Sequence, residues 1–290
     1  MIPLEQIESY LSPPLLLCAL VALGLAVGTL TGLFGVGGGF ITTPLLNVLL
    51  GIPYNLAVGS DLCAIIATSS SGVQRHMRLR NFEARSMLVL AAASMIGAYF
   101  GADACMGLKG FCGHNFSRVM HSLFIVILLL TAWVVATGAG TSRTGRSLLQ
   151  RLPLPPRLDL PQARLEGVSL PGLCLLGLVI GGLKGLMGIG GGVLFMPMLI
   201  VAVGLEAHQA IGTSLGVVLL SSLTGTAKHG LNGNVCLWIV CPLMVGGTIG
   251  VQAGAWLCQR FNAQRIRRYF SVLALAVATV IAIDLVRGLL

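Results

Sequence analysis

A run of glycines within an apolar segment is the part of this sequence best able to bind a ligand through its backbone. The sequence Gly-Val-Gly-Gly-Gly at 35–39 interrupts an apolar run from Leu15 to Leu50, and Pro44 follows it. Each glycine costs a helix about 1 kcal/mol relative to alanine, so a regular helix ends here and leaves backbone N–H groups without helical partners. Inside a bilayer such a break is tolerated only where the backbone lines a polar cavity or meets a ligand. The run therefore predicts a binding site at membrane depth.

The same pattern occurs again at a constant offset of 153 positions. Gly-Ile-Gly-Gly-Gly at 188–192 and Pro197 match 35–39 and Pro44. The offset continues without a gap through further pairs, among them Gly59/Gly212, Gly72/Gly225, His76/His229 and Asn81/Asn234. Unrelated apolar segments share leucines and alanines, but they do not share these residues in one register. The chain therefore contains an internal duplication.

Composition indicates a polytopic membrane protein. The chain has 290 residues, 56% of them hydrophobic and 9% charged, with a mean hydropathy of +0.92, whereas soluble proteins are roughly a quarter charged. The net charge of +9 comes mainly from arginines in short loops, which membrane topology explains better than a nucleic-acid partner. The eight cysteines contain no C-x-x-C pair, so we expect no metal site and no cofactor. Cys105 and Cys112 flank a loop, and whether they form a disulfide is left open.

The apolar runs divide the chain into two repeats and a linker. Repeat 1 covers 1–137, with a glycine-broken hairpin followed by helices at 55–73, 84–104 and 117–137. A linker rich in arginine and proline covers 138–168. Repeat 2 covers 169–290, with a hairpin at 170–203 followed by helices at 208–227, 236–257 and 268–287. The amino terminus has no lysine or arginine before the first apolar run, so we expect that run to be a retained membrane segment and not a cleaved signal peptide.

The basic loops favour two inverted repeats. An odd number of membrane-entering segments in each half inverts the halves, and an even number leaves them parallel. With the N-terminus outside and five such segments in each half, the arginine clusters at 75–85, 143–164 and 260–268 are all cytoplasmic. A parallel arrangement would put one cluster on the wrong face. The expected fold is therefore an all-α polytopic membrane protein of two inverted-topology repeats, each with a glycine-broken hairpin and three further helices.

The expected ligand of the glycine runs is a small anion. Free N–H groups at the start of a helix carry partial positive charge, which attracts anions. The residues concerned are Gly37, Gly38 and Gly39 in the first run and Gly190, Gly191 and Gly192 in the second. Lys184 lies four residues before Gly188, and its repeat equivalent is Thr31. A lysine within a membrane segment usually faces a cavity, although snorkelling to a lipid headgroup is the alternative.

Hydroxyl residues at matching positions of the two halves are further candidates. Ser60 and Asp61 align with Thr213 and Ser214 at the start of a helix, where hydroxyls cap the helix or line a cavity. Asp61 could carry a proton, pair with Lys184, or lie solvated at the membrane surface. One or two turns further along, Ser69 aligns with Ser222, where a serine lines a cavity or bonds to its own helix.

Two histidines end the same helix in each repeat. His76 and His229 each follow a basic residue, Arg75 and Lys228. A histidine near a membrane edge is either an interfacial residue or a group for proton coupling or gating. Both functions stay open for this pair.

These motifs resemble those of the sulfite exporter TauE/SafE family of membrane permeases. That family carries, once in each half, a Gly-hydrophobic-Gly-Gly-Gly run with a following proline and then an Ala-Val/Ile-Gly-Thr-Ser-Leu stretch. Here the runs are 35–39 and 188–192, and the stretches are 57–62 and 210–215. The resemblance covers nearly the whole chain. Asp61 stands where the pattern has a hydroxyl residue, which leaves the substrate and the coupling open.

The resemblance implies a secondary transporter of sulfite, thiosulfate-like or organosulfonate anions, or of some carboxylates, in the bacterial inner membrane. It agrees with the anion site inferred from the residues. We expect export by alternating access, no enzymatic activity, and as partners the anion and the lipid bilayer, but no nucleic acid. The oligomeric state, monomer or homodimer, is left open. An anion channel and a permease for another small anion, such as a carboxylate, are the alternatives.

Overall fold

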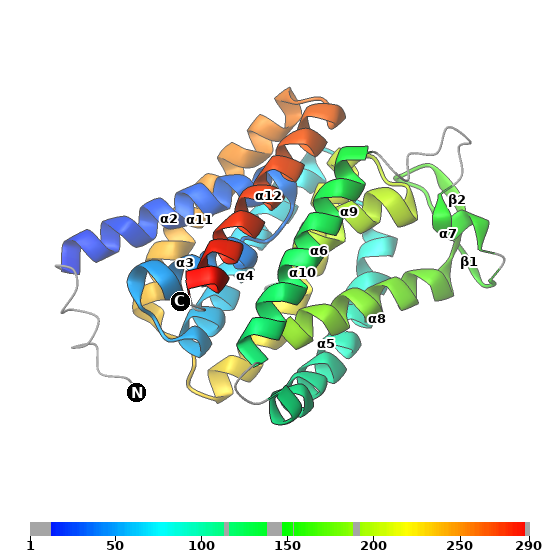
Figure 1. Cartoon of the computed structure of the whole chain (residues 1–290). Helices are drawn as coiled ribbons and strands as arrows, with labels where there is room; N and C mark the ends of the chain where they lie inside the picture. The colour runs from blue at the N-terminus through cyan, green and yellow to red at the C-terminus, as the bar shows by residue number, and fades with distance from the viewer. Residues whose placement is uncertain (1–12, 113–115, 138–146, 153, 188–191, 288–290) are drawn as a thin grey trace.

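The computed structural model describes residues 13–112, 116–137, 147–152, 154–187 and 192–287, almost all of them in helices (Figure 1). The first half contains the following helices: α2 (Pro13–Phe34), α3 (Gly39–Leu50), α4 (Tyr54–Arg78), α5 (Ala84–Cys112) and α6 (Phe116–Thr137). The second half contains α8 (Leu170–Met187), α9 (Gly192–Met198), the π-helical turn η2 (Leu199–Val203), α10 (Ala207–Leu231), α11 (Leu237–Arg260) and α12 (Ala263–Arg287). The predicted all-helical class of the fold is confirmed.

Six of the described helices are long and apolar enough to cross a membrane: α2, α4, α5, α10, α11 and α12. Large apolar side chains are exposed along the outer helices, for example Leu25, Ile96 and Trp133. The buried polar side chains concentrate on α4 and α10, among them Asp61, His76 and Thr213. An apolar exterior around a partly polar interior is the pattern of a multi-pass membrane protein.

The segment between the halves is more ordered than its composition suggests. It contains the short helix α7 (Leu148–Arg151) and an antiparallel pair of strands, β1 (Arg157–Leu160) and β2 (Leu165–Ser169). The sequence analysis predicted only a polar linker here. The apolar side chains of Leu160 and Val168 are buried, and they give the hairpin a contact with the helices despite its many charged residues. β2 also continues to Ser169, one residue past the predicted linker boundary.

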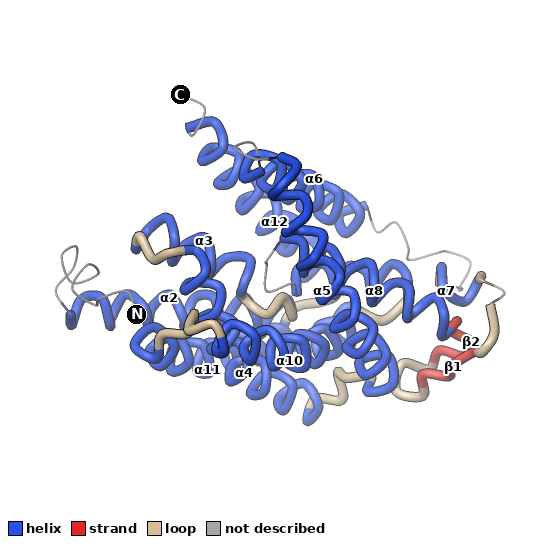
Figure 2. The backbone as a smooth tube through the Cα atoms, turned by 90° about the horizontal axis from the view of Figure 1, so that it is seen from below, coloured by secondary structure: helices blue, strands red, loops and turns tan. Residues whose placement is uncertain are grey.

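The two halves pack on one another in a reciprocal way. α2 lies beside α11, and α5 lies beside α8, so the first helix of each repeat packs on the fourth helix of the other (Figure 1). α6 and α12, the last helices of the repeats, also lie side by side (Figure 2). Such a pattern, in which a surface on one half contacts the equivalent surface on the other, is what a two-fold relation produces.

Glycines allow the close approach of the outer helix pairs. A β-carbon on Gly28 would collide with the backbone of Gly247, and one on Gly101 would collide with the backbone of Gly182. The same holds for Gly250 and Gly254, which face α2. The spaced glycines of these helices are therefore packing residues, as small residues in membrane helices usually are.

α4 and α10 form the centre of the molecule and run antiparallel. Gly59, near the start of α4, lies against His229, near the end of α10, and Gly212 lies in the same way against His76. The backbone carbonyl of Asn234 also lies against Gly59, and that of Asn81, its repeat equivalent, lies against Gly212. A side chain at either glycine would push these helices apart.

Three basic segments meet at one end of the bundle. Arg85, at the start of α5, donates a hydrogen bond to the carbonyl of Asp159 in β1 at 2.9 Å. Gln209, at the start of α10, donates to the carbonyl of Gln162 at 2.9 Å, and His208 lies 3.1 Å from the carbonyl of Phe261. The segments around 75–85, 151–164 and 260–268 therefore share one end of the protein.

Candidate functional site

The first glycine run forms a loop that no other residue type would adopt without strain. Gly35, Gly37 and Gly38 have φ angles of 71°, 72° and 75°, in the left-handed region. The loop ends α2 and starts α3, whose Ile41 and Thr42 amides donate to the carbonyl of Gly38. Within the described part of the chain, the N–H groups of Gly37 and Gly38 donate to no carbonyl oxygen. The glycine break predicted from the sequence is therefore present, with two amides available.

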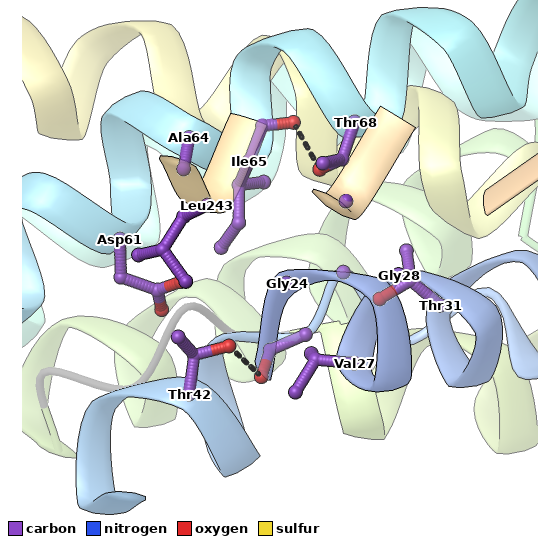
Figure 3. A pocket seen from close by; sticks show the side chains of 13 residues that line it. Gly24, Val27, Gly28, Thr31, Thr42, Asp61, Ala64, Ile65, Thr68 and Leu243 are labelled. Atoms are coloured by element: carbon purple, nitrogen blue, oxygen red, sulfur yellow. Dashed lines mark hydrogen bonds between the residues drawn. The ribbon is translucent and has the colours of Figure 1, made fainter. Parts of the chain in front are cut away.

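A small cavity of about 20 Å³ opens beside this loop (Figure 3). Its lining comes from α2, the loop, α3, α4 and α11, and its polar members are Thr31, Gly37, Gly38, Thr42, Asp61 and Thr68. About 10–15 Å³ of such space is enough for one water molecule. The cavity thus has room for a water-sized particle, but not for an organosulfonate.

Asp61 lies inside the protein and not at an exposed surface. Only 3% of its surface is exposed, and its Oδ2 accepts a hydrogen bond from Thr43 Oγ1 at 3.1 Å. The sequence analysis left open a solvated position and a pair with Lys184. Neither occurs in the structure, since Lys184 Nζ donates to Ser221 Oγ at 2.5 Å and no ion pair joins these two described residues.

Lys184 lies on α8 near the second glycine run. Gly190 and Gly191, two of the predicted site residues, lie outside the described residues. Gly192 begins α9 and packs against the backbone carbonyl of Val36 in the first run. Gly192, the described residue of the second run, therefore lies against the first run. Lys184 occupies the repeat position of Thr31, and Ser221 occupies that of Thr68.

Ser60 and Thr213 each hold a backbone amide of the opposite half. Ser60 Oγ accepts from the N–H of Cys236, just before α11, and Thr213 Oγ1 accepts from the N–H of Glu83, just before α5, both at 3.0 Å. Both side chains are fully buried. These hydroxyls were expected either to cap their own helices or to line a cavity. Each instead accepts a hydrogen bond at the start of a helix in the other repeat.

The remaining predicted hydroxyls differ in their partners. Ser214 donates to the carbonyl of Gly35 at 2.7 Å, which ties α10 to the first glycine loop. Ser222 donates to Leu219 in its own helix at 2.9 Å. Ser69 is completely buried, and its hydroxyl has no partner among the described residues. Ser214 thus contacts the first glycine run.

The paired histidines are packing residues between the halves. His76 is fully buried, with Nε2 3.2 Å from the carbonyl of Gly32. Within the part of the chain that the structure describes, the buried Nδ1 atoms of His76 and His229 have no hydrogen-bond partner. His76 is therefore not an exposed interfacial residue. Neither histidine lines the cavity beside Asp61.

Four threonines near the first loop were not among the predicted site residues. Thr31, Thr42 and Thr68 line the cavity, and Thr43 bonds to Asp61. Thr42 and Thr43 follow the glycine run almost directly, and this position in the sequence could have identified them as site residues. Their repeat equivalents are Phe195 and Met196, so the internal duplication does not mark these two threonines as a matching polar pair.

Comparison with known proteins places these features in a family. A family model described as sulfite exporter TauE/SafE matches residues 20–281, which include both glycine runs, Asp61 and Lys184. The chain belongs to the sulfite exporter TauE/SafE family. The resemblance noted from the motifs is thereby confirmed.

Relatives of this TauE/SafE protein are named as transporters. It is 29% identical to the probable membrane transporter protein YjnA of Bacillus subtilis, over 86% of this chain and 93% of that protein. It is 30% identical to the probable membrane transporter protein MJ0441 of Methanocaldococcus jannaschii, over 74% and 73% of the two chains. No solved structure matches the chain significantly. The protein is thus a multi-pass member of a membrane transporter family.

Proposed function

We propose that this protein is a secondary transporter that exports small sulfur-containing anions, sulfite or an organosulfonate, across the bacterial inner membrane. The main support for this proposal is Lys184. It is a cation on an apolar helix, bonded to Ser221 and four residues from the second glycine run. The amides of Gly37 and Gly38, which donate to no carbonyl of the described residues, supply further donors. A sulfonate or sulfite offers several oxygens of high charge density to such donors.

The proposed mechanism is alternating access between two inverted repeats. It is supported by the antiparallel course of α4 and α10, which are repeat equivalents. It is also supported by the shared end of the three arginine-rich segments, which fits one cytoplasmic face. Inverted repeats place the substrate between their broken helices, where the runs meet at Val36 and Gly192. A cavity of about 20 Å³ then corresponds to a closed state that must open to admit the anion.

Reconstitution into liposomes tests this function. Vesicles loaded with unlabelled sulfite or a small alkanesulfonate should take up the radiolabelled anion by counterflow, which a carrier performs and an open channel does not. Lys184→Ala should reduce the rate at least about tenfold, the effect of losing roughly 1.4 kcal/mol of binding. Lys228→Ala is the matched control, since it removes an exposed lysine at the end of α10. Conductance without counterflow would identify an anion channel instead.

The same vesicles test coupling and substrate class. Uptake driven by a pH gradient would support proton coupling through Asp61, His76 or His229, the hypothesis drawn from the sequence. Uptake that ignores the pH gradient would exclude it. Counterflow of a small carboxylate, with no response to sulfite or sulfonates, would replace the sulfur anion by a carboxylate as substrate.

A further inference from the structure

The cavity beside the first glycine loop is lined by a buried carboxyl group, and no lysine, arginine or histidine among the described residues lines it. Asp61 is buried, and its carboxylate accepts a hydrogen bond from Thr43 and lies within hydrogen-bonding reach of the Thr42 hydroxyl. An ionised carboxylate away from water is costly unless a positive charge accompanies it. Either a proton on the carboxyl group or a bound cation therefore neutralises the site.

Threonine hydroxyls around the cavity can act as acceptors. Thr68 Oγ1 donates to the carbonyl of Ile65 at 3.1 Å, and Thr42 Oγ1 lies 3.2 Å from the carbonyl of Gly38 and also within hydrogen-bonding reach of the Asp61 carboxylate (Figure 3). A hydroxyl has one proton and two lone pairs, so each oxygen keeps lone pairs that can contact a bound cation. Together with Asp61 and Thr31, they form a set of oxygen ligands from three helices.

We propose that this cavity binds one Na⁺ ion, held by the Asp61 carboxylate and by the hydroxyl oxygens of Thr31, Thr42 and Thr68. Broken membrane helices supply ligands for such ions in other folds, through carbonyls and side chains near the break. Here the break is the loop 35–38, and the cavity lies directly against it.

Size and charge select Na⁺ among the cations. The cavity of about 20 Å³ takes one particle no larger than a water molecule, so it admits a single dehydrated monovalent cation. Carboxylate oxygens have a high charge density, and they therefore bind the smaller Na⁺ more strongly than K⁺. Divalent Ca²⁺ usually takes several carboxylates, and this cavity has one. A proton would need only the carboxylate, whereas here three threonines line the cavity with it.

The two halves differ in the charges at equivalent positions. Half one has Asp61 where half two has Ser214, and half two has Lys184 where half one has Thr31. A cation beside Asp61 would cancel the charge that otherwise repels an anion from the adjacent amides of Gly37 and Gly38. Na⁺ and the anion then strengthen each other's binding by the same factor. This coupling rests on the proposed function, whereas the Na⁺ site itself does not.

Thermal unfolding of the purified full-length protein in detergent tests the site. A series of NaCl concentrations, balanced with choline chloride, keeps the chloride concentration and ionic strength constant. The unfolding midpoint should rise with Na⁺ and saturate, and KCl should not reproduce the rise. Asp61→Asn should abolish the response, and Thr68→Val should weaken the apparent affinity for Na⁺ about tenfold or more. Asp159→Asn, in the exposed linker hairpin, is the matched carboxylate control and should respond like the wild type.

Equilibrium binding of radiolabelled sodium to the wild type tests the site directly, and this measurement does not depend on whether a variant folds. Saturable binding of one ion per chain, displaced by unlabelled Na⁺ and not by K⁺, is the expected result. Absence of binding, or binding retained in a folded Asp61→Asn protein, would overturn the proposal. A midpoint that responds to pH but not to Na⁺ would overturn it in favour of a proton site. The anion site is tested separately by measuring whether sulfite raises the unfolding midpoint in choline buffer, which contains no Na⁺. This rise should be lost in Lys184→Ala. The Na⁺ site and the anion site can therefore be disproved independently.

Discussion

The backbone carbonyl of Val36 lies against the α-carbon of Gly192, so close that no side chain fits between them. The contact joins the two glycine runs of the repeats at the centre of the fold. Because the collision would involve backbone on both sides, neither partner can give way by a change of rotamer. The glycine at 192 is therefore needed for this junction and not only for the loop that precedes it.

Gly192→Ala should destabilise the protein by about 1–3 kcal/mol or more, the cost of overpacking a tight interior. Gly212→Ala should behave in the same way, since its β-carbon would collide with the carbonyl of Asn81. The unfolding midpoint in detergent measures both. Gly230→Ala is the control, because nothing lies within 4 Å of its added β-carbon. Equal midpoints for all three variants would show that the close contact is not required.

Thr213→Val should cost about 1–3 kcal/mol of stability, because it leaves the buried N–H of Glu83 without its acceptor. Ser60→Ala should do the same to the N–H of Cys236. Thr279→Val on the exposed face of α12 removes a hydroxyl that bonds within its own helix, and it should be nearly neutral. If the first two variants keep their stability but lose anion binding, these hydroxyls contact substrate, as the sequence analysis predicted.

Single cysteines at Arg80, Arg157 and Arg265 should all react with an impermeant thiol reagent from the same face of the membrane. The account puts these residues at one end of the bundle, and the positive-inside rule makes it the cytoplasmic face. A cysteine at the exposed Asn232, at the far end of α10, should react only from the opposite face. Labelling of Arg157 and Arg265 variants from different sides would contradict the inverted arrangement. The experiment requires a background without the natural cysteines.

The sequence was sufficient to predict the helices, because long apolar runs with glycine, proline and arginine at their ends leave little choice. The expected helix at 84–104 begins where α5 begins, and the expected span 117–137 nearly matches α6. The strands β1 and β2 were missed, since four or five residues in a charged segment carry too weak an alternation. Their stability comes from contacts of Leu160 and Val168 with the helices, which no local pattern shows.

The residues of the candidate site were predictable only in part. The constant offset identified Asp61, Ser214 and the glycine runs, because duplication marks positions that both halves use. It could not show that Ser60 bonds to the opposite repeat, or that Asp61 and Lys184 lie in different polar clusters. Contacts between the halves depend on how the repeats dock, and a one-dimensional comparison contains no information on docking.

Thermal unfolding against a panel of anions tests the central claim, an anion site that depends on Lys184. The purified wild type, Lys184→Ala and Lys228→Ala are measured in sulfite, sulfate, thiosulfate, a small alkanesulfonate and a small carboxylate at constant ionic strength. A ligand at a hundredfold excess over its dissociation constant stabilises the native state by about 2.7 kcal/mol, which shifts the midpoint clearly. The account predicts a selective shift with one sulfur anion, kept in Lys228→Ala and lost in Lys184→Ala. No shift with any anion, or the same shift in both variants, would contradict it.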